Sequence, residues 1–407
     1  MTSVEDVLSN YTDISENGTS NSPYYYYEGD PPVRVETWLV PLIFGTICLI
    51  GIVGNALVIV VILKNKQMRT VTNYYILNLA ISDVAYLTCA VPFSATSHVS
   101  EWVFGEFMCK FSFYAIQVTV QATCITLTAM SVDRYYAIVH PLKSLKTRTP
   151  KVAISAIAAI WLCLKHDIRS VRASNSGLQE ISSTLSVYDF LNPGDSSCMV
   201  AVPVAIYKKI VYFEWYGVRP FCFDVFPTLQ WDFGWYVYTF IAVYALPICI
   251  ITICYSKMLR QLWNQVTPGE ESAHHTQSIK QKKKITKMVF MVTLLFFICW
   301  MPIHIQTIWT RVDTESYHAT ENVYYYHLFA NCLSYANSCL NPFIYAFMGE
   351  NFRKCFRKVF AKWFKKHSAT VAAVGQGQGG VVGSNLGTSS MLAQKQGDGT
   401  LETSSRT

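Results

Sequence analysis

Two acidic residues stand inside stretches of sequence that are otherwise almost entirely apolar. Asp83 lies within the apolar run 72–97, and Asp133 is followed by Arg134 near the end of the run 108–139. A carboxylate beside a guanidinium can form a charge-assisted hydrogen bond. Ionisable residues are costly inside apolar spans, so both sites are candidates for function. The alternatives are a static ion pair at Asp133 and a protonated carboxyl group in a polar network at Asp83.

Aromatic residues and a proline form a second group, in the run 285–309. Pro302 removes a backbone hydrogen bond and is expected to kink its helix. Phe296 and Trp300 precede it, and their bulk could couple the packing of a pocket to the kink. Core packing alone is the other interpretation of these two residues. Neither group contains a nucleophile–base pair, and no Cys-x-x-Cys pair occurs in the chain. The sequence therefore predicts neither an enzyme nor a metal centre.

The elements that must position these residues are segments of membrane-spanning length. Of the 407 residues, 51% are hydrophobic and 14% are charged, whereas about 25% of an average soluble domain is charged. Leu39–Leu63 has no charged residue, and ~20 apolar residues suffice to cross a bilayer. The chain is therefore predicted to be an all-α membrane protein. The long apolar runs are 38–63, 72–97, 108–139, 235–258, 285–309 and 324–348. Two shorter apolar pieces, 152–163 and 197–207, lie between the third and fourth of these runs.

Basic residues between these runs predict how the spans are oriented. They form four sets, which fall on one side of the membrane only if the chain crosses it seven times. The sets begin at Lys64, Arg134, Lys257 and Arg353. By the positive-inside rule, the N-terminus is then outside and the C-terminus is cytoplasmic. The net charge of +7 comes with no basic cluster interleaved with stacking aromatic residues, so nucleic acid is not expected as a partner.

The two ends of the chain have distinct compositions. Residues 1–37 form an acidic, extracellular tail, and Asn10 and Asn17 begin glycosylation acceptor triplets. Residues 350–366 alternate aromatic and basic side chains at helical spacing, which predicts an amphipathic eighth helix lying in the inner membrane interface. Cys355 in that helix is a lipidation candidate. Residues 367–407 are rich in Gly, Gln and Ser and predict a disordered cytoplasmic tail.

One block does not fit the seven-span domain of residues 38–349. The apolar piece 152–163 is too short to cross a bilayer, and residues 164–196 carry seven charged side chains. Joining Cys163 to Ser197 restores an apolar span of 23 residues. We interpret 164–196 as an in-frame insertion that interrupts the fourth helix. The rival interpretation, a polar excursion between two half-helices, would expose irregular backbone to lipid.

The order of polar residues and prolines along the runs resembles the rhodopsin-like (class A) G-protein-coupled receptor family. Each span carries one set of such features, and the likeness covers about residues 38–360 apart from the inserted block. The features are Asn55, Asp83, Cys109, Asp133-Arg134-Tyr135, Trp161, Pro247, Tyr255, Trp300, Pro302 and Asn341-Pro342 followed by Tyr345. Within the family, 68–73, 107–111 and 117–134 look most like kisspeptin receptors, with galanin and allatostatin A receptors next. The implied fold is a seven-transmembrane helix bundle plus the eighth helix.

The resemblance implies a role for each group of residues. No cofactor is expected other than an allosteric sodium ion, for which Asp83, Thr123, Asn337 and Asn341 are the candidate site. Phe296, Trp300 and Pro302 are the activation core. The G-protein switch comprises Asp133, Arg134, Tyr135, Tyr255, Asn341, Pro342 and Tyr345, with the two later tyrosine hydroxyls near Arg134.

The outer side is expected to carry a disulfide and a ligand pocket. Outer surfaces are oxidising, and Cys109 is expected to pair with Cys222 while the other eleven cysteines stay free. The run 108–139 has no acid in its outer half and run 324–348 has no lysine, which disfavours amine and retinal ligands. The acids Glu101, Glu106, Asp224 and Asp313 could meet a basic ligand side chain. The expected pocket residues, for which helix–helix hydrogen bonding is the alternative, are Gln117, Gln121, His304, Gln306, His327 and Asn331.

The expected function is that of a multi-pass plasma-membrane receptor for an extracellular neuropeptide. The resemblance implies activation of a heterotrimeric G protein, on the phospholipase C and calcium branch if the receptor is kisspeptin-like, with arrestin and membrane lipids as further partners. Galanin-like or allatostatin A-like ligands are the alternatives. Two interpretations assign a different class of function. One is a non-signalling splice form that carries 164–196. The other is a channel or transporter, which would require inverted repeats and paired midplane charges that the sequence does not contain.

Overall fold

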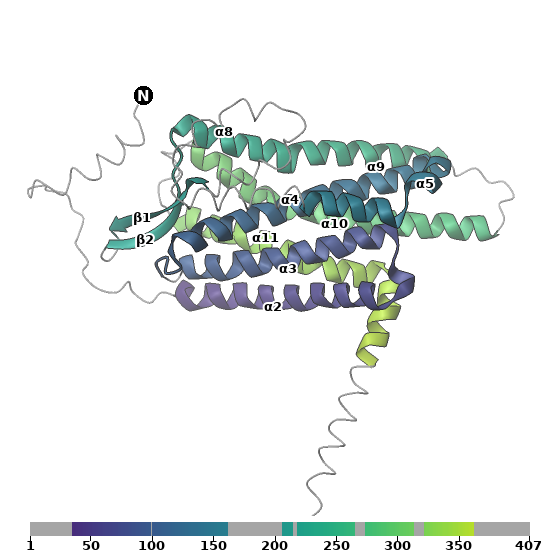
Figure 1. The fold of residues 1–407 in the computed structure, drawn as a ribbon, viewed down its shortest axis with the longest axis horizontal. Coiled ribbons are helices and arrows are strands. Elements are labelled where there is room, and N and C mark those ends of the chain that lie inside the picture. Colours follow the sequence, from purple (N-terminus) through teal and green to yellow (C-terminus); the bar gives the residue numbers. More distant parts are fainter. Residues whose placement is uncertain are drawn as a thin grey trace, which may run out of the picture. The chain divides into compact units, whose positions relative to one another are not determined.

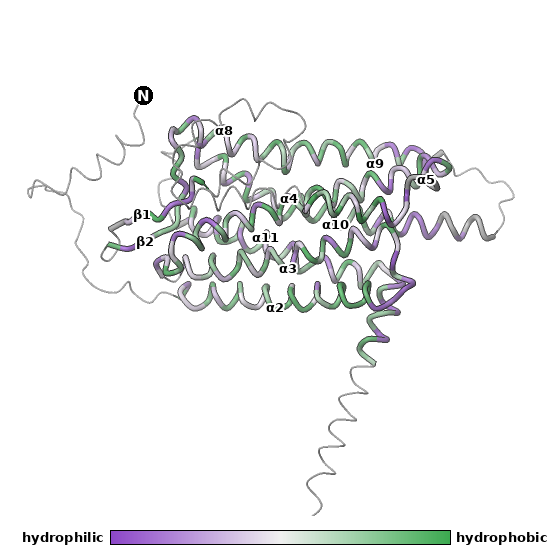
Figure 2. Tube along the Cα trace, in the orientation of Figure 1, coloured by the Kyte–Doolittle hydropathy of each residue, from purple (hydrophilic) through white to green (hydrophobic). Residues whose placement is uncertain are grey.

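Long apolar helices dominate the computed structural model, which describes residues 35–98, 100–161, 206–214, 218–264, 273–312 and 321–361. The glycosylation candidates Asn10 and Asn17, the block 164–196, and the tail 367–407 lie outside these residues. Among the described helices, five are long and apolar enough to cross a membrane. Hydrophobic residues run along these helices, and hydrophilic residues gather towards their ends (Figure 2).

The first half of the bundle contains three spans. They are α2 (Val35–Lys64), α3 (Val71–Ser97) and α4 (Gly105–Val139), and α3 packs against both of the others (Figure 1). The hydroxyl of Thr70 accepts a hydrogen bond from the Asn73 amide and caps α3. Gly105 starts α4 at a positive φ of 74°, a conformation that favours glycine. A short 3-10 turn, η1 (Lys66–Met68), and a short helix, α5 (Pro141–Thr147), follow α2 and α4.

The second half contains three further long segments. The first is continuous through α8 (Leu229–Phe240), the π-helical turn η4 (Ile241–Ala245) and α9 (Leu246–Asn264). It is followed by α10 (Ala273–Val312) and α11 (Glu321–Met348), which pack against each other. Because α11 also packs against α2, and α9 packs against α4, the two halves close into one bundle.

The fourth span is represented by a short apolar helix, Pro150–Trp161. Its Trp161 indole nitrogen donates to Asn78 of α3 at 2.7 Å, and the Asn78 amide donates to Thr126 of α4 at 2.8 Å. Trp161 also packs against a cluster that contains Tyr114 and Ile160. This segment therefore lies against α3 and α4, where the sequence places the start of a fourth helix.

A two-stranded antiparallel hairpin adds to the expected all-α architecture. Strand β1 (Lys208–Glu214) pairs with β2 (Val218–Asp224), and Lys208 lies opposite Asp224 in the register. The strands are short, and β2 mixes Arg and Pro with aromatic residues, so no apolar run signals them. β1 packs against α4, and the Trp102 amide donates to Pro220 of β2 at 2.8 Å.

A further helix follows α11. Residues 350–361 are helical, within the 350–366 predicted for the eighth helix. Gly349 separates it from α11, and a Cβ there would lie 2.6 Å from the Tyr345 carbonyl oxygen, so only glycine fits. Phe352 stacks on Tyr345 with ring centroids 5.5 Å apart. The placement of this helix in a membrane interface stays a prediction.

Candidate functional site

The acid–base pair at the end of α4 forms as the sequence predicts. The guanidinium of Arg134 donates through Nε and Nη2 to Oδ2 of Asp133, and Arg134 is only 4% exposed. Arg148, which follows α5, also binds Asp133, with its Nε 2.6 Å from Oδ1 and its Nη2 3.1 Å from Oδ2. Arg148 was not predicted as a partner of Asp133, since its contact depends on how the loop folds back. One carboxylate thus holds two guanidinium groups, and Arg134 is kept in place by a charge-assisted bond.

The other switch residues form no hydrogen bond to this pair within the described part of the chain. Tyr135 contacts Nε2 of His140 at 3.2 Å, and the Tyr255 ring packs against Phe290 of α10 with centroids 5.0 Å apart. The hydroxyl groups of Tyr255 and Tyr345 are buried, and neither has a hydrogen-bond partner among the described residues. Neither hydroxyl therefore forms a hydrogen bond with Arg134, whose guanidinium is bound to Asp133 instead.

Asp83 lies at the centre of a buried polar cluster between α3 and α11. Its Oδ1 accepts from the Ser338 hydroxyl and its Oδ2 accepts from the Asn341 amide, each at 2.8 Å. Ser338 was not predicted as a partner. The side-chain oxygens of Asn337 and Asn341 are buried without a hydrogen-bond partner among the described residues. Thr123 is buried too, so all four predicted residues lie in the interior, although only Asn341 bonds directly to Asp83.

The predicted activation core is an aromatic cluster around the proline of α10. The rings of Phe296 and Trp300 lie 5.9 Å apart, and Trp300 also contacts Tyr86 of α3 at 5.5 Å. Pro302 lies inside α10, and its carbonyl oxygen accepts a hydrogen bond from the Tyr326 hydroxyl of α11 at 3.1 Å. Tyr326 therefore binds the backbone carbonyl of the proline itself, a role that the sequence did not reveal. Trp300 Nε1 is buried without a partner among the described residues.

The six predicted pocket residues divide into two groups and one separate residue. His327 joins Gln306 and Asn331, because Nδ1 lies 2.5 Å from the Gln306 amide nitrogen and Nε2 lies 2.9 Å from that of Asn331. Gln117 and Gln121 of α4 form the second group, and their buried amide nitrogens have no hydrogen-bond partner among the described residues. Unpaired buried amides are costly, so such groups suit recognition of a polar ligand. His304 instead contacts the Tyr244 ring in η4, with centroids 4.7 Å apart.

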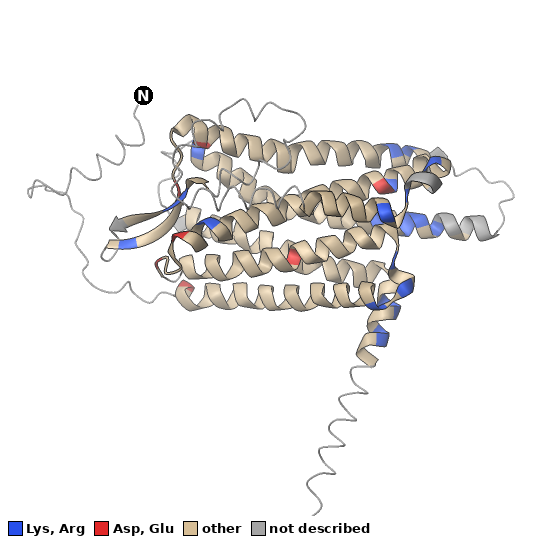
Figure 3. Cartoon of the chain, viewed as in Figure 1, with Lys and Arg blue, Asp and Glu red and all other residues tan. Residues whose placement is uncertain are grey.

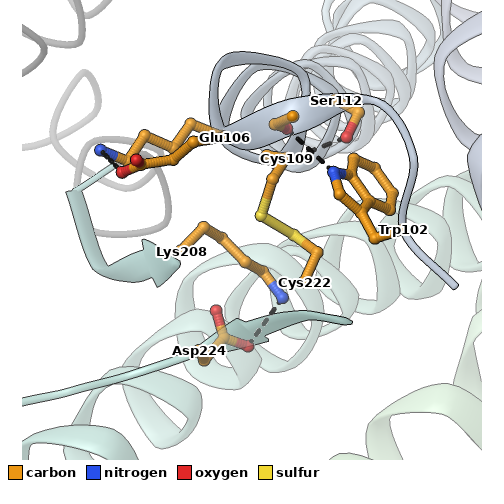
Figure 4. Close-up of a disulfide and its surroundings, with 9 residues drawn as sticks. Trp102, Glu106, Cys109, Ser112, Lys208, Cys222 and Asp224 are labelled. Carbon is orange, nitrogen blue, oxygen red and sulfur yellow. Dashed lines mark hydrogen bonds and ion pairs between the residues drawn. A yellow bond between two sulfur atoms is a disulfide. The ribbon is translucent and has the colours of Figure 1, made fainter. Parts of the chain in front are cut away.

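A disulfide fixes the hairpin near the start of α4, the helix that also carries Gln117 and Gln121. Cys109 and Cys222 are bonded, with Cα atoms 5.8 Å apart, which confirms the predicted pairing (Figure 4). Nine of the other cysteines lie in the described residues, and all nine are free. Cys355, the lipidation candidate, is among them and is 9% exposed. Among the described residues no group of His, Cys, Asp and Glu could hold a metal ion.

The outer acids already have basic partners. Asp224 is paired with Lys208 at 3.1 Å, Glu106 with Lys110 at 2.8 Å and Glu101 with Arg219 at 3.7 Å. A basic ligand group would have to share these carboxylates with their present partners or displace those partners. Asp313 lies outside the described residues.

Comparison with known proteins shows the family to which the chain belongs. The family model "7 transmembrane receptor (rhodopsin family)" matches residues 54–165 and 196–345. The chain belongs to the rhodopsin family of seven-transmembrane receptors. The receptor is 41% identical to "G-protein coupled receptor 54" of Oreochromis niloticus over 83% of this chain and 82% of that protein. It is 38% identical to the human "KiSS-1 receptor", over 81% of this chain and 76% of the relative. It is 35% identical to the "Allatostatin-A receptor" of Bombyx mori, over 84% of this chain and 85% of that receptor.

Family membership sets the fold and the class of the receptor. It is a multi-pass membrane protein and a class A G-protein-coupled receptor close to the kisspeptin group, not an enzyme, a channel or a transporter. The family match also leaves residues 166–195 unmatched, and these fall inside the block 164–196 that the sequence analysis set apart.

Proposed function

We propose that this receptor is activated by an extracellular, kisspeptin-like neuropeptide and stimulates nucleotide exchange on a heterotrimeric G protein. The main support is the 38% identity to the human KiSS-1 receptor, compared with 35% for the allatostatin-A receptor, beside the 41% identity to G-protein coupled receptor 54. Unpaired amides of Gln117 and Gln121 suit a neutral, polar ligand group such as a peptide bond. Galanin-like and allatostatin A-like peptides remain the alternatives.

The described residues support a route from the pocket to the G protein. A peptide that contacts the outer parts of α4, α10 and α11 shifts the packing of Trp300 and Phe296. Pro302 lacks a backbone N–H and makes α10 bendable at that level. Movement of the inner part of α10 then favours release of Arg134 from Asp133, so that Arg134 meets the G protein. Such rearrangements of packed helices are typical two-state transitions.

Charge distribution supports the orientation with the N-terminus outside and the C-terminus inside. Basic residues gather at one end of the bundle, near α5 and the start of α10 (Figure 3). They include Lys64, Arg134, Arg148, Lys257 and Lys284. By the positive-inside rule this end is cytoplasmic, and the disulfide-bonded hairpin is then extracellular. Arrestin and membrane lipids are proposed as further partners at the cytoplasmic end.

Calcium release from cells that express the receptor tests this function and its phospholipase C branch. Kisspeptin-like, galanin-like and allatostatin A-like peptides are applied at graded concentrations, and the kisspeptin-like peptides are expected to be the most potent. An Arg134→Ala variant should reach the surface yet give no calcium signal, because the group that meets the G protein is missing. Silence of a surface-expressed receptor towards kisspeptin-like peptides would refute the ligand assignment.

We also propose that Asp83, Thr123, Asn337 and Asn341 hold a sodium ion. Hard cations take oxygen ligands, and the buried, unpaired oxygens of Asn337 and Asn341 beside the Asp83 cluster fit that requirement. A sodium ion would supply positive charge next to the carboxylate and stabilise the resting packing of α3 against α11.

Replacing Asp83 with asparagine should remove the effect of sodium on agonist affinity. For the unaltered receptor we expect sodium to weaken peptide binding by about 5- to 20-fold, the usual scale of allosteric coupling. The measurement is radiolabelled peptide displacement in sodium chloride against choline chloride at equal ionic strength. A Cys249→Ser variant, at an exposed free cysteine, should keep the sodium effect. Equal sodium sensitivity in Asp83→Asn would exclude this site.

A further inference from the structure

Four charged residues at the hairpin end of the bundle form two ion pairs. Lys208 of β1 lies 3.1 Å from Oδ2 of Asp224, its cross-strand neighbour (Figure 4). Its ammonium also lies 3.7 Å from the centre of the Phe113 ring on α4, as a cation–π contact. Arg311 in the last turn of α10 pairs with Asp232 in the first turn of α8, with Nε 3.1 Å from Oδ2.

Tyr236 of α8 joins these two pairs. Its hydroxyl donates to Oδ2 of Asp224 at 2.6 Å, and the guanidinium carbon of Arg311 lies 3.3 Å from the centre of its ring. Asp232 and Tyr236 are one helical turn apart, so Arg311 can pair with the first while it stacks on the second. A continuous chain of contacts therefore runs from the hairpin through α8 to the outer end of α10.

These contacts are shielded enough to affect the position of α10. The side chains of Asp232 and Arg311 are each 21% exposed, and that of Lys208 is 9% exposed. Exposed ion pairs contribute little, whereas pairs withdrawn from solvent leave a costly unpaired charge when one partner is lost. Two positive and two negative groups balance within the cluster, so it needs no ligand to satisfy its charges. The cluster is thus a structural link between elements rather than an open acidic binding site.

We propose that Arg311, Asp232 and Tyr236 form a latch that holds the outer end of α10 against α8 and thereby favours the resting receptor. The inference rests on the proposed function. The helix α10 continues through Pro302 from Ala273 to Val312, so an inner movement that tilts the whole helix as well as bending it at Pro302 also displaces Arg311. Opening of the latch is therefore coupled to the rearrangement that frees Arg134. Arg311 acts through the position of α10 and is a positioning residue.

Loss of the latch should raise signalling without agonist. Arg311→Gln and Asp232→Asn each remove one partner, and each is expected to raise basal G-protein activation about 3- to 10-fold, within the usual range of coupling between two states. Tyr236→Phe keeps the ring under Arg311 but loses the bond to Asp224, so its increase should be smaller. The measurement is basal nucleotide exchange in membranes, normalised to surface-labelled receptor.

A charge exchange separates the latch from general destabilisation. The double variant Asp232→Arg with Arg311→Asp restores an ion pair between the same helices, and its basal activity should return to within about twofold of the original, as expected for directly coupled residues. Cys249→Ser is the control, because this free, exposed cysteine of α9 takes no part in the latch or in the predicted pocket. Its basal activity should be unchanged.

Hydrogen exchange provides a readout that does not depend on the peptide or the G protein. In purified receptor, the backbone amides of residues 303–312 should exchange faster in Arg311→Gln and Asp232→Asn, and at the original rate in the charge-exchanged variant. Unchanged exchange in the single variants refutes the latch, whatever the ligand is. Faster exchange, restored by the charge exchange, in a receptor that activates no G protein would support the latch as a physical link and refute the proposed function.

Discussion

Deleting residues 164–196 should raise the amount of receptor at the cell surface tenfold or more. The block carries seven charged residues between two apolar pieces, and the family match omits residues 166–195. One charged residue at mid-membrane costs ~2.5–3.5 kcal/mol on insertion scales, and each ~1.4 kcal/mol is a factor of ten in an equilibrium. Joining Cys163 to Ser197 gives a span of 23 residues, long enough to cross, so insertion of the fourth helix becomes favourable.

Surface labelling of an epitope at the N-terminus measures this effect, with calcium release as the functional readout. A chain that lacks residues 375–407 is the matched control, because it loses the same number of residues from the polar tail. The tail deletion should change surface expression little. If the full chain reaches the surface as well as the 164–196 deletion does, the block is an accommodated part of a functional receptor, and the proposal of an interrupting insertion is wrong.

The spans were predictable because lipid imposes a simple rule on sequence. A helix that crosses the bilayer must be apolar for most of its length, so runs such as 72–97 coincide with α3 almost residue for residue. The ends of α10 were less predictable. Its apolar run begins at residue 285, but the helix begins at Ala273, because Lys and Gln are good helix formers and continue the helix beyond the apolar part.

The hairpin lacked a comparable signal. Its strands are seven residues each, and their identity depends on pairing with each other and on attachment to α4, which is tertiary information. β propensity is strongly dependent on such context. The cysteine pairing was nevertheless predictable, because the family resemblance supplied the two positions.

Contacts within the candidate site also divide into those that the sequence shows directly and those that depend on the folded structure. The Asp133–Arg134 pair joins neighbours in the chain, so the sequence shows it directly. Arg148 and Ser338 reach their carboxylates only after the chain folds, over separations of 15 and 255 residues. No single-sequence pattern encodes such a distance. The expected proximity of the Tyr255 and Tyr345 hydroxyls to Arg134 is also a tertiary relation, and neither hydroxyl has a hydrogen-bond partner among the described residues.

Replacing Cys222 with serine should destabilise the receptor and reduce peptide potency at least tenfold. The disulfide closes a loop with a sequence separation of 113 residues, for which chain-entropy reasoning gives about 4–5 kcal/mol. It also places β2 so that Asp224 meets Tyr236 and Lys208 meets Phe113. Without it, the hairpin loses its covalent attachment to α4 beside the pocket. Thermal unfolding of purified receptor and peptide concentration–response curves measure the two effects.

Combining the two cysteine variants distinguishes the loss of the disulfide bond from the loss of each side chain's own packing. Cys109→Ser breaks the same disulfide, so the double variant should be no worse than either single one. Cys249→Ser, at an exposed free cysteine in α9, should leave stability and potency unchanged. Additive losses in the double variant would mean that each cysteine acts through its own packing. Equal losses mean that the covalent attachment of the hairpin is what the pocket requires, and the latch at Arg311 should then be weakened in the same variants, with faster hydrogen exchange at residues 303–312.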